Sequence, residues 1–197
     1  MNILFFADVH SDMDSLRTIK DKADKADILV CAGDISQMEL QLPKIIEYLD
    51  TFNKPVLMVH GNHEDERGLK ELCEQSDNII FLHKGVHHIN EYIFMGYGGD
   101  GFSTNDSEFT RVANAFFKPE AKDKEKIILI THGPPHNTVI DNLGGNNRGN
   151  KSYREFIDDI KPHIAVSGHL HENSGKKHQI GRTLFMNPGK KGVLINI

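Results

Sequence analysis

Short apolar runs alternate along the chain with polar stretches whose apolar residues recur at helical spacing, a pattern typical of strands joined by crossover helices. Two runs, ILFF at 3–6 and IILI at 127–130, are apolar on both faces, as in central strands of a covered sheet. We expect strands over residues 2–7, 28–32, 55–60, 79–82, 92–97, 126–131, 163–167, 183–186 and 192–196. We expect helices over residues 12–25, 38–50, 66–76, 108–117 and 152–160.

Three of these helices begin next to residues that cap helix N-termini. The first follows Ser11 and Asp12, the fourth follows Ser107, and the last begins at Ser152 with Glu155 three residues later. Such side chains accept hydrogen bonds from the free backbone N–H groups of a first helical turn. The pattern as a whole predicts the α/β class.

Length and composition limit the possible classes of protein. A chain of 197 residues fits one domain over residues 1–197. The net charge of −5 disfavours binding that depends on many cations contacting nucleic-acid phosphates, and we expect no sequence-specific nucleic-acid partner. The two cysteines, Cys31 and Cys73, make a disulfide framework improbable. The apolar runs are far shorter than the roughly 20 residues of a membrane span, so we expect no membrane partner.

The N-terminal stretch MNILFFADVH has no basic start, no long apolar core and no small-residue cleavage site. It therefore does not resemble an export signal. We expect a cytoplasmic protein, and its oligomeric state stays open.

Side chains that can bind metal follow the carboxyl ends of five predicted strands, where active sites of α/β folds are built. In chain order they are Asp8, His10, Asp34, Asn62, His63, His132, His169 and His171. Because side chains alternate along an extended strand, each D-x-H or H-x-H pair is expected to point both side chains to one side. We interpret the remaining candidates as surface or hydrogen-bonded histidines: His60, His83, His87, His88, His163 and His178.

The mixture of side chains narrows the choice of metal. Imidazole, carboxylate and amide groups without a thiolate suit Mn, Fe, Zn, Co or Ni and disfavour an iron–sulfur or Cys-type zinc site. Seven candidate ligands, with His63 set aside, are too many for one ion. Two ions that share one carboxylate fit the number of ligands.

These residues fall into five ordered blocks: Asp8-Val9-His10, Gly33-Asp34, Gly61-Asn62-His63-Glu64, His132 and Gly168-His169-Leu170-His171. The ordered set resembles the calcineurin-like metallophosphoesterases. THGPP at 131–135 and GHLHENSG at 168–175 are similar to the small phosphodiesterase branch of that family. The resemblance implies an αββα sandwich, in which two mixed sheets are flanked by helices.

The resemblance also implies a role for each residue. One metal would be held by Asp8, His10, Asp34 and His171. The other would be held by Asp34, Asn62, His132 and His169, so that Asp34 bridges the two ions. His63 would be catalytic and face the leaving-group oxygen, and Asn62 and His63 would contact the substrate. Two positions depart from the common family pattern, Asp12 and Gln37.

The function implied is that of a dinuclear metal-dependent phosphoesterase acting on small phosphate esters, with phosphodiesters preferred. A metal-bridging hydroxide would attack phosphorus in line, and manganese is the ion we expect. A phosphomonoesterase is the alternative within enzymes. A non-catalytic protein-binding scaffold of the same fold is a further alternative, which the complete set of ligands disfavours.

One other motif fits a different function. Residues 96–101 match the G-x-G-x-x-G pattern of dinucleotide-binding folds, but no helix is predicted directly after them. We interpret them as a glycine-rich strand end near the rim of the site, where the backbone passes closely.

Overall fold

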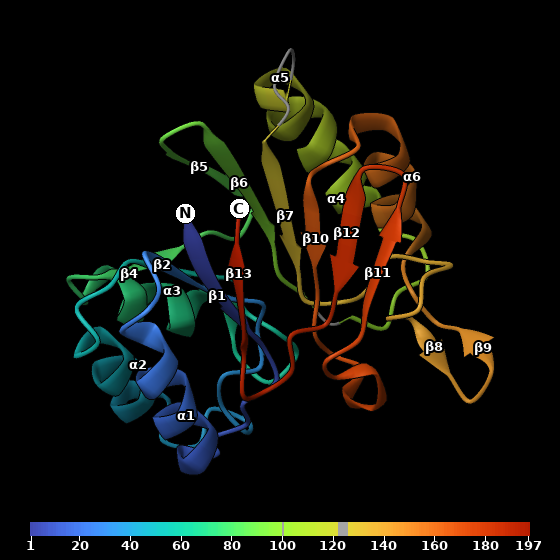
Figure 1. Cartoon of the computed structure of the whole chain (residues 1–197). Helices are drawn as coiled ribbons and strands as arrows, with labels where there is room; N and C mark the ends of the chain where they lie inside the picture. Colours follow the sequence, from blue (N-terminus) through green and yellow to red (C-terminus); the bar gives the residue numbers. More distant parts are fainter. Residues whose placement is uncertain (100, 122–125) are drawn as a thin grey trace.

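Two mixed β-sheets lie face to face, with helices on both outer sides (Figure 1). The structure is a computed structural model that describes residues 1–99, 101–121 and 126–197. Asp100 of the glycine-rich motif lies outside the described residues. The αββα sandwich that the family resemblance implies is confirmed.

The first sheet has the strand order β13-β1-β2-β3-β4, in which all strands but β13 run parallel. Its strands are β1 (Asn2–Phe6), β2 (Ile28–Cys31), β3 (Val56–Met58), β4 (Ile79–Phe81) and β13 (Val193–Asn196). The helices on its outer face are α1 (Met13–Ala23), α2 (Leu42–Asp50) and α3 (Glu66–Glu74).

The second sheet has the strand order β11-β12-β10-β7-β6-β5, with antiparallel strands at both edges. Its strands are β5 (Gly85–Ile89), β6 (Tyr92–Tyr97), β7 (Ile127–Thr131), β10 (Ile164–Val166), β11 (Lys177–Ile180) and β12 (Thr183–Met186). Its helical cover consists of α4 (Ser107–Val112), a π-helical turn (Ala113–Phe117), α5 (Lys118–Ala121) and α6 (Lys151–Ile160). A separate hairpin joins β8 (Asn142–Leu143) to β9 (Asn146–Asn147).

The core forms three apolar layers because the central strands are apolar on both faces. In β1, Leu4 and Phe6 pack with the helices of the first sheet, whereas Ile3 and Phe5 pack between the two sheets. A third cluster lies between the second sheet and its helices. Burying one such large side chain stabilises the fold by about 1.5–3 kcal/mol. Because side chains alternate along β1, this one strand packs against the helix layer on one face and against the second sheet on the other.

All nine predicted strands are present, and β5, β11 and the two short strands of the hairpin were missed. Three details of the predicted helices are wrong. The helix predicted over 38–50 begins at Leu42, after a turn in which Met38, Glu39 and Gln41 have positive φ. The helix predicted over 108–117 changes from α to π geometry at Ala113.

The third wrong detail concerns the caps. The predicted cap Asp12 is confirmed, since its side chain accepts from the backbone N–H groups of the first turn of α1. The caps predicted at Ser107 and Ser152 are wrong. Asp106 caps α4 and Asn150 caps α6, because their side-chain oxygens reach backbone N–H groups two or three residues ahead.

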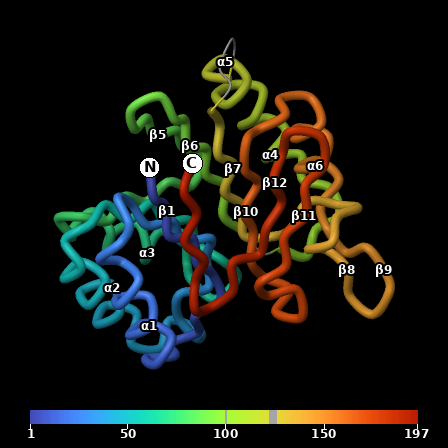
Figure 2. The backbone as a smooth tube through the Cα atoms, viewed as in Figure 1, coloured from blue at the N-terminus to red at the C-terminus, as the bar shows by residue number. Residues whose placement is uncertain are grey.

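The two chain ends lie together, because β1 and β13 are neighbours in the first sheet (Figure 2). The Met1 amino group donates to the Ile197 carbonyl at 2.7 Å. In the described part of the chain, every helix is too short or too polar to cross a lipid bilayer.

Candidate metal centre

The eight predicted site residues converge where the parallel strands β1, β2, β3, β7 and β10 end. Each residue follows one of these strands, in a loop or a short turn. Parallel strands carry their carboxyl ends to the same edge of a sheet, and in this fold the corresponding edges of the two sheets meet. Segments far apart in the sequence thus contribute side chains to one cluster.

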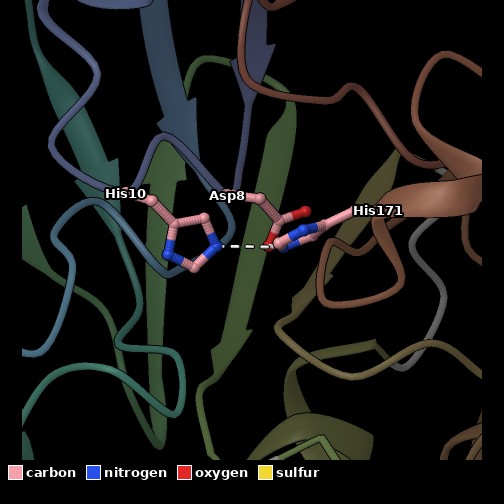
Figure 3. A group of neighbouring side chains, drawn as sticks. All are labelled: Asp8, His10 and His171. Atoms are coloured by element: carbon pink, nitrogen blue, oxygen red, sulfur yellow. Dashed lines mark hydrogen bonds and ion pairs between the residues drawn. The ribbon is translucent and has the colours of Figure 1, made fainter.

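Asp8, His10 and His171 form one part of this cluster (Figure 3). His10 Nε2 lies 2.9 Å from His171 Nε2, and His171 Nε2 lies 3.9 Å from Asp8 Oδ1. Asp8 and His10 come from the loop after β1, whereas His171 begins a short 3₁₀ turn after β10. Two imidazole nitrogens and a carboxylate oxygen therefore face one another across the two sheets.

Asp34 lies at the middle of the cluster. Its Oδ2 is 3.4 Å from His132 Nε2, 3.7 Å from His10 Nε2 and 3.9 Å from His63 Nε2. Its other oxygen accepts the backbone N–H of His63 at 3.0 Å. Asp34 is thus the carboxylate placed between the two groups of candidate ligands, where a bridging ligand would have to lie.

Asn62 joins the remaining histidines. Its Oδ1 lies 3.1 Å from His132 Nε2 and 3.0 Å from His169 Nδ1. His132 Nδ1 lies 2.9 Å from the Ala32 carbonyl, to which it donates. Such a backbone contact fixes the orientation of the ring and leaves Nε2 directed at the cluster, as in metal-binding histidines. All eight predicted side chains are brought together.

The donor set fits divalent ions. Asp8 Oδ2 and His10 Nδ1 are buried polar atoms without a hydrogen-bond partner among the described residues. Buried polar atoms are nearly always paired, so an unpaired one beside a group of ligands indicates an unseen partner such as an ion. Carboxylate, imidazole and amide groups together suit first-row divalent metals.

Charge inside the cluster favours an ionised Asp34. Burial alone raises the pKa of Asp34, but the hydrogen bond and positive charge of His132 outweigh burial and bring the pKa to about 2. Burial lowers the pKa of His132, and Asp34 overcomes that effect and raises it to about 9. Asp34 is therefore an anion at neutral pH and can serve as a ligand.

The backbone of the cluster is strained at four positions. Asp8, His10, Asp34 and His169 have φ values of 58°, 49°, 52° and 68°. Few non-glycine residues adopt this left-handed region, and such residues concentrate at functional sites. The expectation that Asp8 and His10 share one side of an extended segment is therefore wrong. The two side chains meet because the chain turns at both residues, and His169 and His171 face different members of the cluster.

Two glycines of the ordered blocks allow close approach to the carboxylates. A Cβ atom on Gly61 would lie 2.6 Å from the backbone nitrogen of Asp34, and one on Gly168 would lie 2.8 Å from both carboxylate oxygens of Asp8. Any side chain at these positions would displace a candidate ligand. Glycine is thus required at these positions because a larger residue would collide with the ligands. The same holds at the glycine-rich strand end, as predicted, because a Cβ atom on Gly101 would lie 2.7 Å from the His169 ring.

Glu64 is a positioning residue to which the sequence assigned no role. Its carboxylate accepts from the backbone N–H groups of Asp34 at 3.1 Å, Gly61 at 3.0 Å and Ser36 at 2.8 Å, and from the Ser36 hydroxyl at 2.9 Å. Burial raises its pKa, and the backbone N–H groups act in the opposite direction. Glu64 ties the loop after β2 to the loop after β3. The only signal in the sequence was a carboxylate beside Asn62-His63.

His63 is oriented through the segment that contains Gln37. The Met38 backbone N–H donates to His63 Nδ1 at 3.2 Å, and Gln37 Nε2 lies 3.3 Å from the same nitrogen. Because a backbone N–H can only donate, Nδ1 accepts and the ring hydrogen of neutral His63 is on Nε2. That nitrogen faces Asp34. Gln37, one of the two positions that depart from the common family pattern, therefore contacts His63.

The cluster opens onto a pocket of about 510 Å³. Asp8, His10 and His171 line it together with Asp12 and Lys190. Lys190 Nζ lies 2.8 Å from Asp12 Oδ2. This volume is in the range of small-molecule sites.

Comparisons with known proteins agree with this fold. An uncharacterised protein of Methanocaldococcus jannaschii is 29% identical over 99% of this chain and 91% of its own length. The structure is similar to that of TT1561 of Thermus thermophilus, with a TM-score of 0.76, 17% identity and coverage of 96% and 90% of the two chains. It is also similar to a dimetal phosphatase from Danio rerio, with a TM-score of 0.68, 12% identity and coverage of 95% and 86%.

The model of the family described as calcineurin-like phosphoesterase matches residues 1–173, which include every residue of the cluster. This chain therefore belongs to the calcineurin-like phosphoesterases.

Proposed function

We propose that this protein is a dinuclear metal-dependent phosphoesterase that prefers small phosphodiesters. The observation that carries the proposal is the position of the buried Asp34 carboxylate between two groups of imidazole, carboxylate and amide ligands. One ion would be held by Asp8, His10, Asp34 and His171. The other would be held by Asp34, Asn62, His132 and His169.

Manganese is the ion we propose, with Fe, Zn, Co or Ni as the alternatives that the same ligands suit. Two divalent ions held here would lower the pKa of a water molecule and offset negative charge on phosphoryl oxygens. Hydrogen bonds within the chain keep the carboxylate and imidazole ligands in place. His132 is fixed by the Ala32 carbonyl, and Asp34 by the His63 backbone N–H.

His63 is the proposed catalytic residue for the leaving group. Its Nδ1 accepts from Met38, so Nε2–H is the group available toward the substrate. Hydrogen-bond donation or proton transfer to the departing oxygen by such a group contributes roughly 10²–10⁴-fold to the rate. Asn62, next to it, is the proposed second contact to the substrate.

The charge of the pocket supports the preference for diesters. A phosphomonoester is close to a dianion at neutral pH, whereas a diester carries one negative charge. Of the described residues lining the pocket at the metal centre, Lys190 is the one with a permanent positive charge, and it is paired with Asp12. Among the described residues, the lining of the pocket thus offers no arginine clamp of the kind that binds dianionic phosphate.

A direct comparison of two substrates tests the proposal. With Mn²⁺ added, the protein should hydrolyse bis(p-nitrophenyl) phosphate with a higher kcat/KM than p-nitrophenyl phosphate. A reversed ratio would show the alternative, a phosphomonoesterase. Failure of every added divalent metal to support hydrolysis of either compound would favour a protein-binding scaffold.

A further inference from the structure

A second pocket lies next to the metal centre, where strands β3 and β6 end. Its volume is about 390 Å³, and His60 and His83 line it. His60 stands two residues before Asn62, and its carbonyl accepts the Gly99 backbone N–H at 3.3 Å. The pocket and the metal centre therefore share the short segment after β3.

Two buried imidazoles in this pocket each keep one ring nitrogen without a hydrogen-bond partner. His60 is 8% exposed and the side chain of His83 is 4% exposed. Their Nε2 atoms have no hydrogen-bond partner in the part of the chain that the structure describes. The two ring centroids lie 4.5 Å apart. The sequence interpretation of these histidines as surface or hydrogen-bonded residues is thus correct for one nitrogen of each ring and misses the other.

The hydrogen bonds at the opposite ring nitrogens determine what each Nε2 can do. His60 Nδ1 lies 3.0 Å from the Gly61 carbonyl, which can only accept, so Nδ1 carries the hydrogen and Nε2 is an acceptor. The Gly98 backbone N–H donates to His83 Nδ1 at 2.8 Å, so the hydrogen of the neutral His83 ring is on Nε2. The wall of the pocket thus holds a buried acceptor on His60 without a hydrogen-bond partner, and a buried donor on His83 whose neighbouring carboxylate oxygen, on Glu66, is 3.5 Å away.

This arrangement disfavours a metal site, although Glu66 Oε2 lies 3.5 Å from His83 Nε2 and completes a group of possible ligands. A metal needs the Nε2 lone pair of His83, and that would require Nδ1 to give up the Gly98 N–H. Burial also lowers the pKa of His83 to about 3, with smaller contributions from His60 and Lys84, so the ring is neutral at physiological pH.

We propose that this pocket binds a hydroxyl group of the alcohol portion of the substrate, which makes hydroxylated phosphodiesters, such as esters of glycerol or a sugar, the substrate class. A hydroxyl oxygen accepts from His83 Nε2–H while its hydrogen is donated to His60 Nε2. A water molecule makes the same two bonds but occupies only about 30 Å³ of the space. The assignment of the ligand as part of a substrate rests on the proposed function.

The charged residues in the lining favour a neutral ligand. The carboxylates of Glu66, Asp106 and Glu108 line the pocket together with the ammonium group of Lys84. Lys84 Nζ lies 3.6 Å from Glu66 and 3.2 Å from Glu108. Three carboxylates against one ammonium repel a second phosphate and accept hydrogen bonds from further hydroxyl groups. A polyol matches this lining.

The test compares two diesters with the same leaving group, glyceryl p-nitrophenyl phosphate and methyl p-nitrophenyl phosphate. The variant His83→Asn retains an acceptor near the position of Nδ1 for the Gly98 N–H and removes Nε2–H. His178→Asn, at an exposed position of β11, is the matched control. We expect the wild type to prefer the glyceryl ester in kcat/KM. We expect His83→Asn to reduce that preference by roughly three- to tenfold, chiefly through KM, and the control to leave it unchanged.

Direct binding separates this inference from the proposed function. Glycerol added to chelator-treated wild-type protein should shift the ring nitrogen signals of His60 and His83 in histidine-selective NMR spectra, and should shift those of His178 much less. These shifts without hydrolysis of either diester would refute the proposed function and support a polyol pocket. An unchanged glyceryl preference in His83→Asn would overturn the inference, as would Zn²⁺ binding that is lost only in His83→Asn.

Discussion

Replacing Glu64 by glutamine tests whether the metal centre depends on a side chain to which we assign no ion. Glu64 is 6% exposed, and its two oxygens accept four hydrogen bonds from the loops after β2 and β3. Glutamine has the same shape but presents an NH₂ group in place of one oxygen. The change therefore alters hydrogen bonding with little effect on packing.

The expected loss of stability follows from where that NH₂ group must lie. At the Oε2 position it would face the N–H groups of Asp34 and Gly61, and at the Oε1 position it would face Ser36 N–H and the Ser36 hydroxyl. The hydroxyl can turn and accept, so the second arrangement leaves one backbone N–H unpaired. A buried unpaired donor costs about 1–3 kcal/mol. For a chain of this length, a loss of about 2 kcal/mol lowers the Tm by about 4–8 °C.

The assay is urea and thermal unfolding of chelator-treated protein, followed by metal titration. Glu74→Gln is the matched control. Glu74 is exposed on α3, and its ion pair with Lys70, at a distance of 3.8 Å, is exposed to solvent and therefore weak. Its free energy of unfolding should change by less than about 0.5 kcal/mol. We also expect Glu64→Gln to weaken metal binding by roughly 10–100-fold, as loss of a group that orients ligands does. Equal stability and equal metal affinity in Glu64→Gln and wild type would refute the reasoning.

Three further predictions concern the centre and its surroundings. Asp34→Ala should lose bound metal and activity together in elemental analysis and diester hydrolysis, and retained metal-dependent turnover would contradict the bridging assignment. His63→Ala should retain its metal but lose roughly 10²–10⁴-fold in kcat, most for poor leaving groups, whereas a uniform loss for all leaving groups would exclude the proposed role. Asp12→Ala should lower the free energy of unfolding by about 1 kcal/mol because it removes the cap of α1, and Asp12→Asn should restore most of that loss in urea titrations.

The central strands could be predicted because their apolar residues point both ways. Runs such as ILFF in β1 pack against helices on one face and against the other sheet on the other face. The edge strands β5 and β11 could not be predicted in this way, because GVHHI is only half-buried and KHQI faces solvent at three of its four residues, so neither has a buried apolar face. Pairing with β6 and β12, rather than an apolar pattern of their own, makes these segments strands.

The side chains that meet in the candidate metal centre could be grouped from their order in the chain, but the hydrogen bonds that connect them could not be predicted. The ordered blocks placed Asp8, Asp34 and His132 in one cluster. The role of Glu64 depends on backbone N–H groups of two loops, which carry no residue-specific signal. The unpaired nitrogens of His60 and His83 depend on which carbonyl or N–H each ring meets, and only the folded chain determines that.

If the proposed ions bind at this cluster, the left-handed backbone at Asp8, His10, Asp34 and His169 would make the metal-free chain the more fragile form of this protein. At about 1 kcal/mol for each position, this strain removes several kcal/mol from a net stability of about 5–15 kcal/mol. Ions that bind only the folded chain would return that free energy. A cell short of the right metal would therefore lose the protein to proteolysis as well as its activity, so that ion supply would control abundance and turnover together.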